Sequence, residues 1–429
     1  MDTLARALTG RLLLPADADY ARAKLAFLTL YDDRRPAAVA LCESEADVQR
    51  CVEFAATQGI PVAARSGGHS YAGYSTPDGG LIIDVSRLDT VKVHPDGTAT
   101  VGAGARMAAV YDGIGRAGRM LSAGTCPTVG VAGLTLGGGI GVLGRKCGLA
   151  SDQLVAARIV TADGVLRAVS ETREPDLFWA LRGGGGGNFG VVTSFTFRTT
   201  PAEPLTVWSL DYSPDYRPAI LDAWPEWQQD VPDEMWSQCR VGTSLTISQA
   251  AGCLVGTDTS LIDDLVRRIG GNPERRQRKL DFLATMDHYA DPIGERAAFV
   301  SVSRMLTGPM DPQAMVDLVT AGPEMLCLID SFGGAITRGE GAFPHRDAIA
   351  SIQVTNQVTT TIDKARRELA PVREQLGEWF GVNGFVNYID PDMPDWRQAY
   401  YGANAPRLAE IARRYDPDGV FAFPQAIRP

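Results

Sequence analysis

The stretch Arg65-Ser66-Gly67-Gly68-His69-Ser70 decides the fold of this sequence, because it follows a short apolar strand expected at 60–64 with a turn that carries little side-chain bulk. A second stretch of this kind is Gly124-Thr125-Cys126-Pro127-Thr128-Val129-Gly130, which precedes the glycine-rich residues 137–141. Each stretch presents one nucleophilic side chain, His69 or Cys126, on a backbone with few bulky neighbours. These two side chains are therefore the first candidates for chemistry.

Both side chains also have a purely structural interpretation. A neutral imidazole such as that of His69 can attack an electrophilic carbon, but it can equally be a satisfied loop histidine. A free cysteine is most often a buried structural thiol, although Gly124 and Pro127 favour a rigid loop that presents the sulfur of Cys126. The residues alone leave both interpretations open.

The composition is that of a soluble globular protein. The 429 residues, 45% hydrophobic and 21% charged, suggest two or three domains at roughly 150 residues each. A net charge of −10 argues against a nucleic-acid binder, and seven scattered cysteines without a CxxC pair predict neither disulfides nor a metal site. Without a signal peptide or an apolar run of about 18 residues, we expect a cytoplasmic protein that inserts into no membrane.

Helix and strand signals change character near residue 200. Before it, Ser44 is the expected N-cap of a helix that Gly59 ends. The other expected elements in this part are a helix at 106–117 and strands at 81–85, 98–101, 154–160, 165–169 and 189–197. Residues 122–150 show neither helical nor strand periodicity. After Pro201 and Pro204, strands and helices alternate, and Trp208, Trp224, Trp227 and Trp236 are expected in a core.

Residues 139–144, GIGVLG, match the GxGxxG pattern of dinucleotide-binding proteins, but such a match alone is weak. That fold needs a helix directly after the pattern, and Gly148 would interrupt any helix here. We therefore expect no dinucleotide-binding fold. The glycines still let main-chain N–H groups approach a phosphate closely, and the five glycines at 183–187 are either a second such place or a flexible turn.

Several stretches together resemble the berberine-bridge-enzyme-like branch of the vanillyl-alcohol-oxidase superfamily, which has a PCMH-type FAD-binding domain. They occur in the family's order and are RSGGHSYAGYS (65–75), AGTCPTVGVAGLTLGGGIGVLGRKCGLASDQL (123–154), DLFWALRGGGGGNFGVVTSF (176–195), NYIDP (387–391) and YYGANAPRLAEIARRYDPDGVFAFPQAI (400–427). The resemblance covers most of the first 200 residues and the last 50. The middle of the chain resembles the family only in organisation.

The resemblance implies an α+β fold with a two-part FAD-binding domain and an inserted α/β substrate domain, an antiparallel sheet covered by helices. The N-terminal part of the FAD domain is expected at 1–200 and the substrate domain at 201–380. The C-terminal segment, 381–429, is expected to return to the FAD domain.

The resemblance also implies which residues bind FAD. His69 would bond the 8α carbon of the flavin and Cys126 would bond C6. Main-chain donors of the first turn would hold the pyrophosphate, and the residues concerned are Arg65, Ser66, Gly67, Gly68 and Ser70. The remaining expected contacts to FAD are Val129, Gly130, Gly133, Gly137, Gly138, Gly141, Gly148, Val192 and Asn387.

Tyr388 matches the family's catalytic tyrosine, and Gln353 is a candidate for a polar group aimed at the flavin. The implied reaction takes a hydride from a hydroxyl- or amine-bearing carbon of a sugar or secondary metabolite and reduces O2 to H2O2. Two alternatives remain open: a dehydrogenase that uses another electron acceptor, and a resistance protein that binds a drug or metabolite. Phe385, often tyrosine in relatives, argues against a second tyrosine role there.

Overall fold

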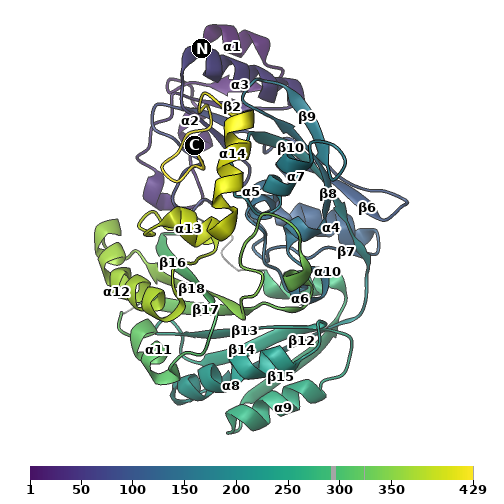
Figure 1. The fold of residues 1–429 in the computed structure, drawn as a ribbon, viewed down its shortest axis with the longest axis vertical. Coiled ribbons are helices and arrows are strands. Elements are labelled where there is room, and N and C mark those ends of the chain that lie inside the picture. The colour runs from purple at the N-terminus through teal and green to yellow at the C-terminus, as the bar shows by residue number, and fades with distance from the viewer. Residues whose placement is uncertain (291–295, 323, 429) are drawn as a thin grey trace.

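The computed structural model describes residues 1–290, 296–322 and 324–428. It has the α+β architecture that the resemblance implied. Figure 1 shows an upper body that contains both chain termini and a lower body built on one large sheet covered by helices. The predicted fold class is therefore confirmed.

A four-stranded sheet carries the first glycine-rich turn. Its strands lie in the order β1 (Arg11–Leu13), β2 (Ala38–Leu41), β4 (Leu81–Asp84) and β3 (Val62–Arg65). Strands β2, β4 and β3 are parallel, so the turn that follows Arg65 leaves the carboxyl edge of parallel strands, where ligands commonly bind. The predicted helix is α3 (Glu45–Gln58), which begins after Ser44, whose Oγ accepts from the Asp47 N–H, and ends at Gly59 with φ of 64°.

A five-stranded antiparallel sheet forms the rest of the upper body. Its order is β5 (Val91–Val93), β6 (Thr98–Gly102), β10 (Val191–Arg198), β8 (Leu154–Val160) and β9 (Leu166–Ser170). The short elements around these sheets are α1 (Asp2–Ala7), α2 (Tyr20–Ala23), α4 (Met107–Arg116), β7 (Arg119–Met120), α7 (Pro175–Leu181) and β11 (Thr200–Pro201).

The glycine-rich segment 122–150 contains two short helices, α5 (Val131–Leu136) and α6 (Gly144–Cys147), so the prediction that it lacks helix was wrong. Six or fewer residues span at most about two turns, too short for a hydrophobic period to show in the sequence. Gly148 ends α6 with φ of 83°, as its position predicted.

The lower body is a seven-stranded antiparallel sheet covered on one face by helices. The strand order is β15 (Glu274–Leu280), β12 (Leu205–Tyr212), β14 (Ser248–Val255), β13 (Met235–Gly242), β17 (Met325–Ser331), β18 (Ala350–Gln357) and β16 (Phe299–Leu306). The helices α8 (Arg217–Asp230), α9 (Ser260–Ile269), α11 (Pro312–Val319) and α12 (Ile362–Phe380) lie on the outer face, whereas α10 (Phe282–Tyr289) contacts α4 of the upper body.

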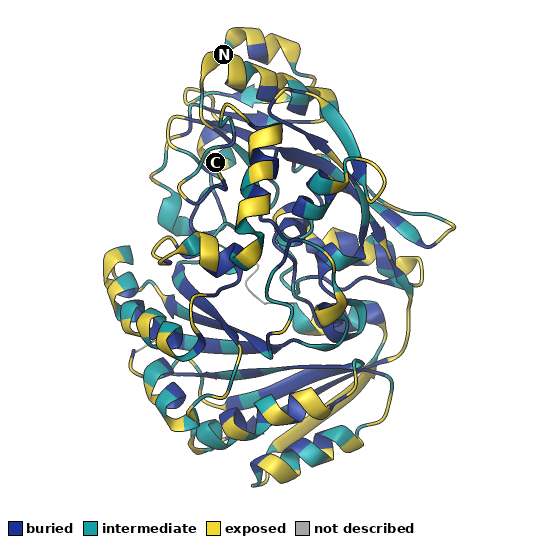
Figure 2. Cartoon of the chain, in the orientation of Figure 1, coloured by how far each residue is buried: buried dark blue, intermediate teal, exposed yellow. Residues whose placement is uncertain are grey.

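The expected tryptophan core is confirmed. Trp208, Trp224 and Trp227 are buried between the large sheet and its helices, and Trp236 is buried with the core of the upper body. Figure 2 shows the strands mostly buried and the outer sides of the helices exposed. The opposite, inner face of the sheet is turned toward the upper body, and α10 packs on its β12–β15 end.

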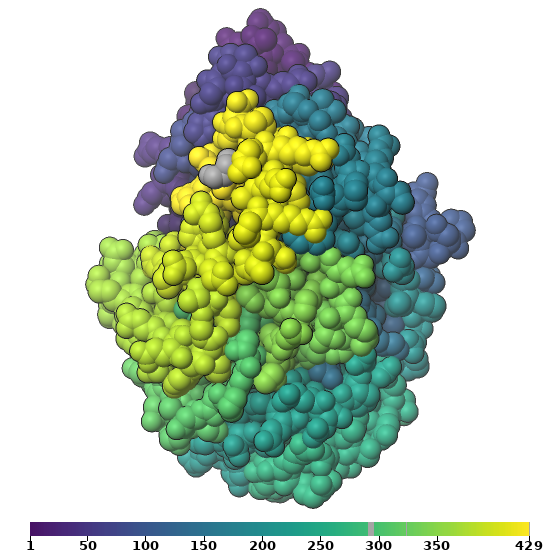
Figure 3. Space-filling model, viewed as in Figure 1, coloured from purple at the N-terminus to yellow at the C-terminus, as the bar shows by residue number. Residues whose placement is uncertain are grey.

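The C-terminal segment returns to the upper body through the short turn Val386–Tyr388, α13 (Trp396–Tyr401) and α14 (Ala405–Tyr415). The Ile427 N–H donates to Asn188 Oδ1 at 2.9 Å and fixes the end of the chain to the five-glycine segment. In Figure 3 this segment fills the space between the N-terminal part and the lower body. Among the described residues, no helix combines the length and apolarity needed to cross a membrane.

Arg145 joins the two bodies. Its buried guanidinium leaves α6 and donates to Gln228 Oε1 at 3.0 Å, to the Val231 carbonyl at 2.9 Å and to the Phe332 carbonyl. All three acceptors belong to the lower body. Because a buried acceptor that loses its donor cannot regain water, this one side chain holds the large sheet in place over the upper body.

Replacement of Arg145 by Met should destabilise the protein by about 3 kcal/mol, because buried acceptors lose their donor while the volume is kept. Urea unfolding followed by tryptophan fluorescence measures this change. Arg267→Gln, at an exposed ion pair on α9, is the matched control and should stay within about 0.5 kcal/mol of the wild type. Equal stability of Arg145→Met and the control would contradict the role of Arg145.

Candidate functional site

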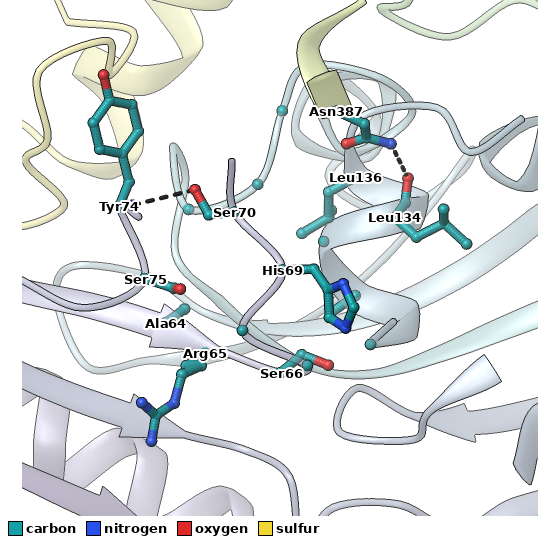
Figure 4. A pocket seen from close by; sticks show the side chains of 18 of the residues that line it. Ala64, Arg65, Ser66, His69, Ser70, Tyr74, Ser75, Leu134, Leu136 and Asn387 are labelled. Atoms are coloured by element: carbon teal, nitrogen blue, oxygen red, sulfur yellow. Dashed lines mark hydrogen bonds between the residues drawn. The ribbon is translucent and has the colours of Figure 1, made fainter. Parts of the chain in front are cut away.

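A cavity of about 330 Å³ lies where the two glycine-rich stretches meet residues 185–192 and 386–389. Thirteen of the residues predicted from the sequence line it: Arg65, Ser66, Gly67, Gly68, His69, Ser70, Cys126, Val129, Gly130, Gly133, Val192, Asn387 and Tyr388. Figure 4 shows His69, Ser70 and Asn387 around this space. Segments that are distant in the sequence thus form one wall.

The His69 and Cys126 side chains share a neighbour, Thr128. Its Oγ1 lies 3.1 Å from His69 Nε2 and 3.5 Å from Cys126 Sγ. The imidazole is also stacked on Phe27, with ring centroids 3.9 Å apart. Phe27 therefore fixes the plane of the imidazole and Thr128 engages Nε2, while Nδ1 meets no hydrogen-bond partner among the described residues.

His69 is neutral at physiological pH. Burial, with a smaller contribution from the positive charge of Arg106, lowers the pKa of His69 from 6.5 to about 4, and a main-chain hydrogen bond to Thr128 opposes the shift only in part. A neutral imidazole keeps a lone pair that can form a bond to carbon. The environment of His69 thus favours its nucleophilic form.

Close main-chain packing sets the distance between the two stretches. A Cβ added to Gly67 would lie 2.2 Å from the Gly130 nitrogen, and one added to Gly130 would lie 2.1 Å from Ser66 Oγ. Ser66 Oγ donates to the Ala103 carbonyl at 2.6 Å, so it cannot move aside without losing that bond. Only glycine fits at both positions.

The Arg65 side chain does not face the cavity. Its Nε donates to Asp84 Oδ2 at 2.9 Å in a buried ion pair, and the other nitrogens donate to the carbonyls of Ala23 and Lys24. Figure 4 shows the guanidinium directed away from His69 and Ser70. An anion held by this turn would therefore contact main-chain N–H groups, as expected for the first stretch.

Four glycines predicted at the site lie behind the cavity wall: Gly137, Gly138, Gly141 and Gly148. A Cβ at Gly137 would lie 2.0 Å from Asn387 Oδ1, and one at Gly141 would lie 2.0 Å from the Ala123 carbonyl oxygen. These glycines allow close main-chain packing here, and the FAD contacts expected of them stay a prediction. Asn387, held by Gly137 and by its bond to the Leu134 carbonyl, does reach the cavity.

Tyr388 is stacked on Tyr71, a cavity residue that the sequence reasoning did not single out. The two ring centroids are 5.8 Å apart with an interplanar angle of 12°. Gln353 lies outside the cavity wall on β18 and donates to the Tyr71 hydroxyl at 3.1 Å. Gln353 is therefore placed to position Tyr71, and its own contact with the flavin stays a prediction.

A second residue that the sequence reasoning missed is Asp330, which β17 places on the inner face of the large sheet. Burial raises the pKa of Asp330 to about 7, although the charge of Arg240 acts in the opposite direction. Burial, followed by the nearby Asp330 and Tyr71, in turn raises the pKa of Tyr388 well above its usual value of 10. Nothing in the local sequence marks Asp330, because its proximity to Tyr388 arises only in the folded chain.

Comparison with known proteins agrees with this site. Residues 36–170 match the FAD binding domain family, and residues 384–428 match the family described as berberine and berberine like. Over 98% of this chain and 97% of the relative, the sequence is 31% identical to the FAD-linked oxidoreductase YgaK of Bacillus subtilis (strain 168). The chain belongs to the berberine-bridge-enzyme-like FAD-linked oxidoreductases.

Two sugar oxidases are also similar to this FAD-linked oxidoreductase. The chitooligosaccharide oxidase of Gibberella zeae is 30% identical over 97% of this chain and 92% of its own length. The glucooligosaccharide oxidase of Acremonium strictum, described with a 6-S-cysteinyl, 8α-N1-histidyl FAD, superposes with a TM-score of 0.88. It is 26% identical, and the match covers 100% of this chain and 99% of that one.

The cavity of this oxidoreductase fits FAD. The main-chain N–H groups of residues 66–70 meet no protein acceptor within the described part of the chain, so they can donate to a pyrophosphate. A Cβ at Gly133 would have no neighbour within 4 Å, and those at Gly186 and Gly187 would have one neighbour each, beyond 3.6 Å. These three glycines keep the wall open.

Gly67→Ala should separate the two stretches and abolish tight FAD binding, because its Cβ would overlap the main chain at Gly130. The ratio of flavin to protein absorbance after purification measures retention, and we expect a loss of at least about tenfold. Gly308→Ala is the control, since a Cβ there has no neighbour within 4 Å and should leave the ratio unchanged. Full retention of flavin by Gly67→Ala would show that the contact is not required.

Proposed function

We propose that this protein is an oxidase that holds FAD by two covalent bonds, to His69 Nδ1 and to Cys126 Sγ. The observation that carries the proposal is the contact of Thr128 Oγ1 with both side chains, at 3.1 Å and 3.5 Å. It brings the two nucleophiles to one side of the cavity and engages Nε2. The same pair of linkages is named for the oxidase of Acremonium strictum, which supports the assignment.

Different residues would hold different parts of the cofactor. Main-chain donors of the first turn face the pyrophosphate, and the open wall at Gly133 and residues 186–187 leaves room for the remainder. Once bound, FAD would supply the hydride acceptor and the redox chemistry that reduces dioxygen to hydrogen peroxide. Two bonds would keep the ring in place without a closed cavity, so bulky substrates can still enter.

Tyr388 is the proposed base that takes the proton from the substrate hydroxyl or amine. Because the pKa of Tyr388 lies well above 10, its phenol is protonated at neutral pH. Tyr388 can therefore accept the substrate proton only if it passes its own proton to a second acceptor. Asp330 is suited to this role because its pKa of about 7 lets it exchange a proton near neutral pH. Gln353 and Tyr71 hold the Tyr388 ring from the other side.

The proposed substrate is a small molecule with an oxidisable hydroxyl- or amine-bearing carbon, such as a sugar or a secondary metabolite. The named activities of two similar proteins support the sugar. The polar side chains of Gln353 and Asp330 on the inner face of the large sheet, near Tyr388, are consistent with either.

Intact mass of the denatured protein tests the two bonds. The wild type should carry the mass of one FAD, and His69→Ala and Cys126→Ala should each keep it through the remaining bond, while the double variant should lose it. Thr128→Val should leave a mixture of loaded and unloaded chains, because the imidazole is no longer oriented. Cys147→Ala, at a half-buried cysteine that does not line the cavity, is the matched control and should stay fully loaded. Wild-type protein without added mass would refute the covalent assignment.

The pH dependence of flavin reduction tests the proton acceptors. With any alcohol substrate that reduces the flavin, kcat/KM should rise with pH through about 7, because Asp330 must be ionised to accept the proton. Asp330→Asn should remove this rise, and Tyr388→Phe should lower kcat/KM by about 100-fold or more. Tyr216→Phe, on the helix-covered side of the sheet, is the control. An unchanged profile in Asp330→Asn would exclude Asp330 as the acceptor.

A further inference from the structure

The inner face of the large sheet carries a row of paired residues that leads from the reaction centre to an arginine. In register, Gln353 on β18 pairs with Leu328 on β17, Leu328 pairs with Arg240 on β13, and Arg240 pairs with Gln249 on β14. Directly paired residues place their side chains on the same face of a sheet. Cys239 and Val241, which flank Arg240, are buried under the helices, so Arg240 lies on the opposite face.

Arg240 differs from the other arginines whose Nε is buried, because its guanidinium has no partner among the described residues. Within the described residues, five arginines have a buried Nε without a hydrogen-bond partner: Arg145, Arg182, Arg217, Arg240 and Arg304. The other four use their remaining nitrogens or guanidinium face in hydrogen bonds, an ion pair or a cation–π contact. For Arg240 the described part of the chain provides no side-chain hydrogen bond or ion pair at all.

An unpaired, half-buried guanidinium is costly, because it gives up water without gaining an acceptor. Asp330 is the acidic residue whose pKa the charge of Arg240 affects, and it pairs in register with Gln238, two residues before Arg240 on β13. The positive charge of Arg240 lowers the pKa of Asp330, but the two side chains form no ion pair. Because burial still raises this pKa to about 7, Asp330 is partly neutral at neutral pH. The guanidinium is thus available to an acceptor that comes from outside the chain.

The position of Arg240 relative to Tyr388 defines where that acceptor lies on a ligand. Two strand spacings separate Arg240 from Gln353, which is about 10 Å. The amide of Gln353 reaches Tyr71, and Tyr71 stacks on Tyr388. A ligand that spans this row would therefore place one end at Tyr388 and a second group, one or two sugar rings away, at Arg240.

We propose that Arg240 binds a carboxylate on the substrate, so that the preferred substrates are acidic, such as oligosaccharides that contain a uronic acid. A guanidinium has a planar set of donors that matches a carboxylate in two-point contact. Gln238, a neighbour of Arg240 on the same face, offers a neutral amide to the surrounding hydroxyls, whereas the Gln249 amide donates to Asp211 Oδ1 at 2.6 Å and keeps only its oxygen for a ligand. This inference rests on the proposed function, because it assigns the far end of the same substrate.

The test compares two disaccharides that differ in one group: cellobiose, and the same disaccharide with a carboxylate in place of the terminal CH2OH of its non-reducing ring. Anaerobic calorimetric titration of the flavin-loaded protein at pH 8, with the flavin reduced beforehand so that neither disaccharide is oxidised, gives Kd for each. The wild type should bind the acid at least about tenfold more tightly. Arg240→Gln should abolish this preference, and Arg240→Lys should keep part of it. Arg267→Gln, which removes the same charge from an exposed helix, should retain the full preference.

Equal affinity of the wild type for the two disaccharides, no binding of the acid, or a preference that survives in Arg240→Gln would overturn the proposal. Melting temperatures of the variants show whether Arg240→Gln is folded, and Arg240→Lys gives a second measurement if it is not. The mass of the same samples separates the two hypotheses. Covalently loaded protein that does not distinguish the disaccharides refutes the role of Arg240 alone, whereas absent covalent flavin refutes the proposed function.

Discussion

The contact between the main chains of Gly67 and Gly130 is the constraint on which the rest of the site depends. It brings a turn at the end of a parallel strand against a loop more than sixty residues later, and no side chain fits between them. His69 and Cys126 are near each other because these backbones touch. Thr128 then links their side chains, and burial keeps the imidazole neutral.

The large sheet contributes the other half of the site from the middle of the chain. Its helix-covered face is a conventional apolar core, which frees the opposite face to carry polar residues toward the cavity. Arg145 holds this sheet against the upper body, and the C-terminal segment delivers Asn387 and Tyr388 to the seam. The cavity residues and the proposed base therefore come from separate stretches of chain, the two glycine-rich stretches together with residues 185–192 and 386–389.

Much of this was predictable where the signal is local. The strand at 154–160 and the Ser44 cap follow from a few adjacent residues, and the histidine, cysteine and tyrosine stood out through motifs. The role of Gly137, Gly138, Gly141 and Gly148 stays a prediction, because in a sequence a glycine that permits backbone packing looks like one that lines a cavity. Thr128, Tyr71, Asp330 and Arg240 were missed because strand register and long-range packing decide their neighbours. The predicted division at residues 200 and 380 remains a prediction.

The most direct test of the account is a crystal structure of the flavin-loaded protein at a resolution that separates bonded from non-bonded atoms. The account predicts continuous density from His69 Nδ1 to the 8α carbon and from Cys126 Sγ to C6, with Thr128 Oγ1 still on Nε2. Flavin bound without either bond, or bonded through Nε2 with Thr128 displaced, would contradict it.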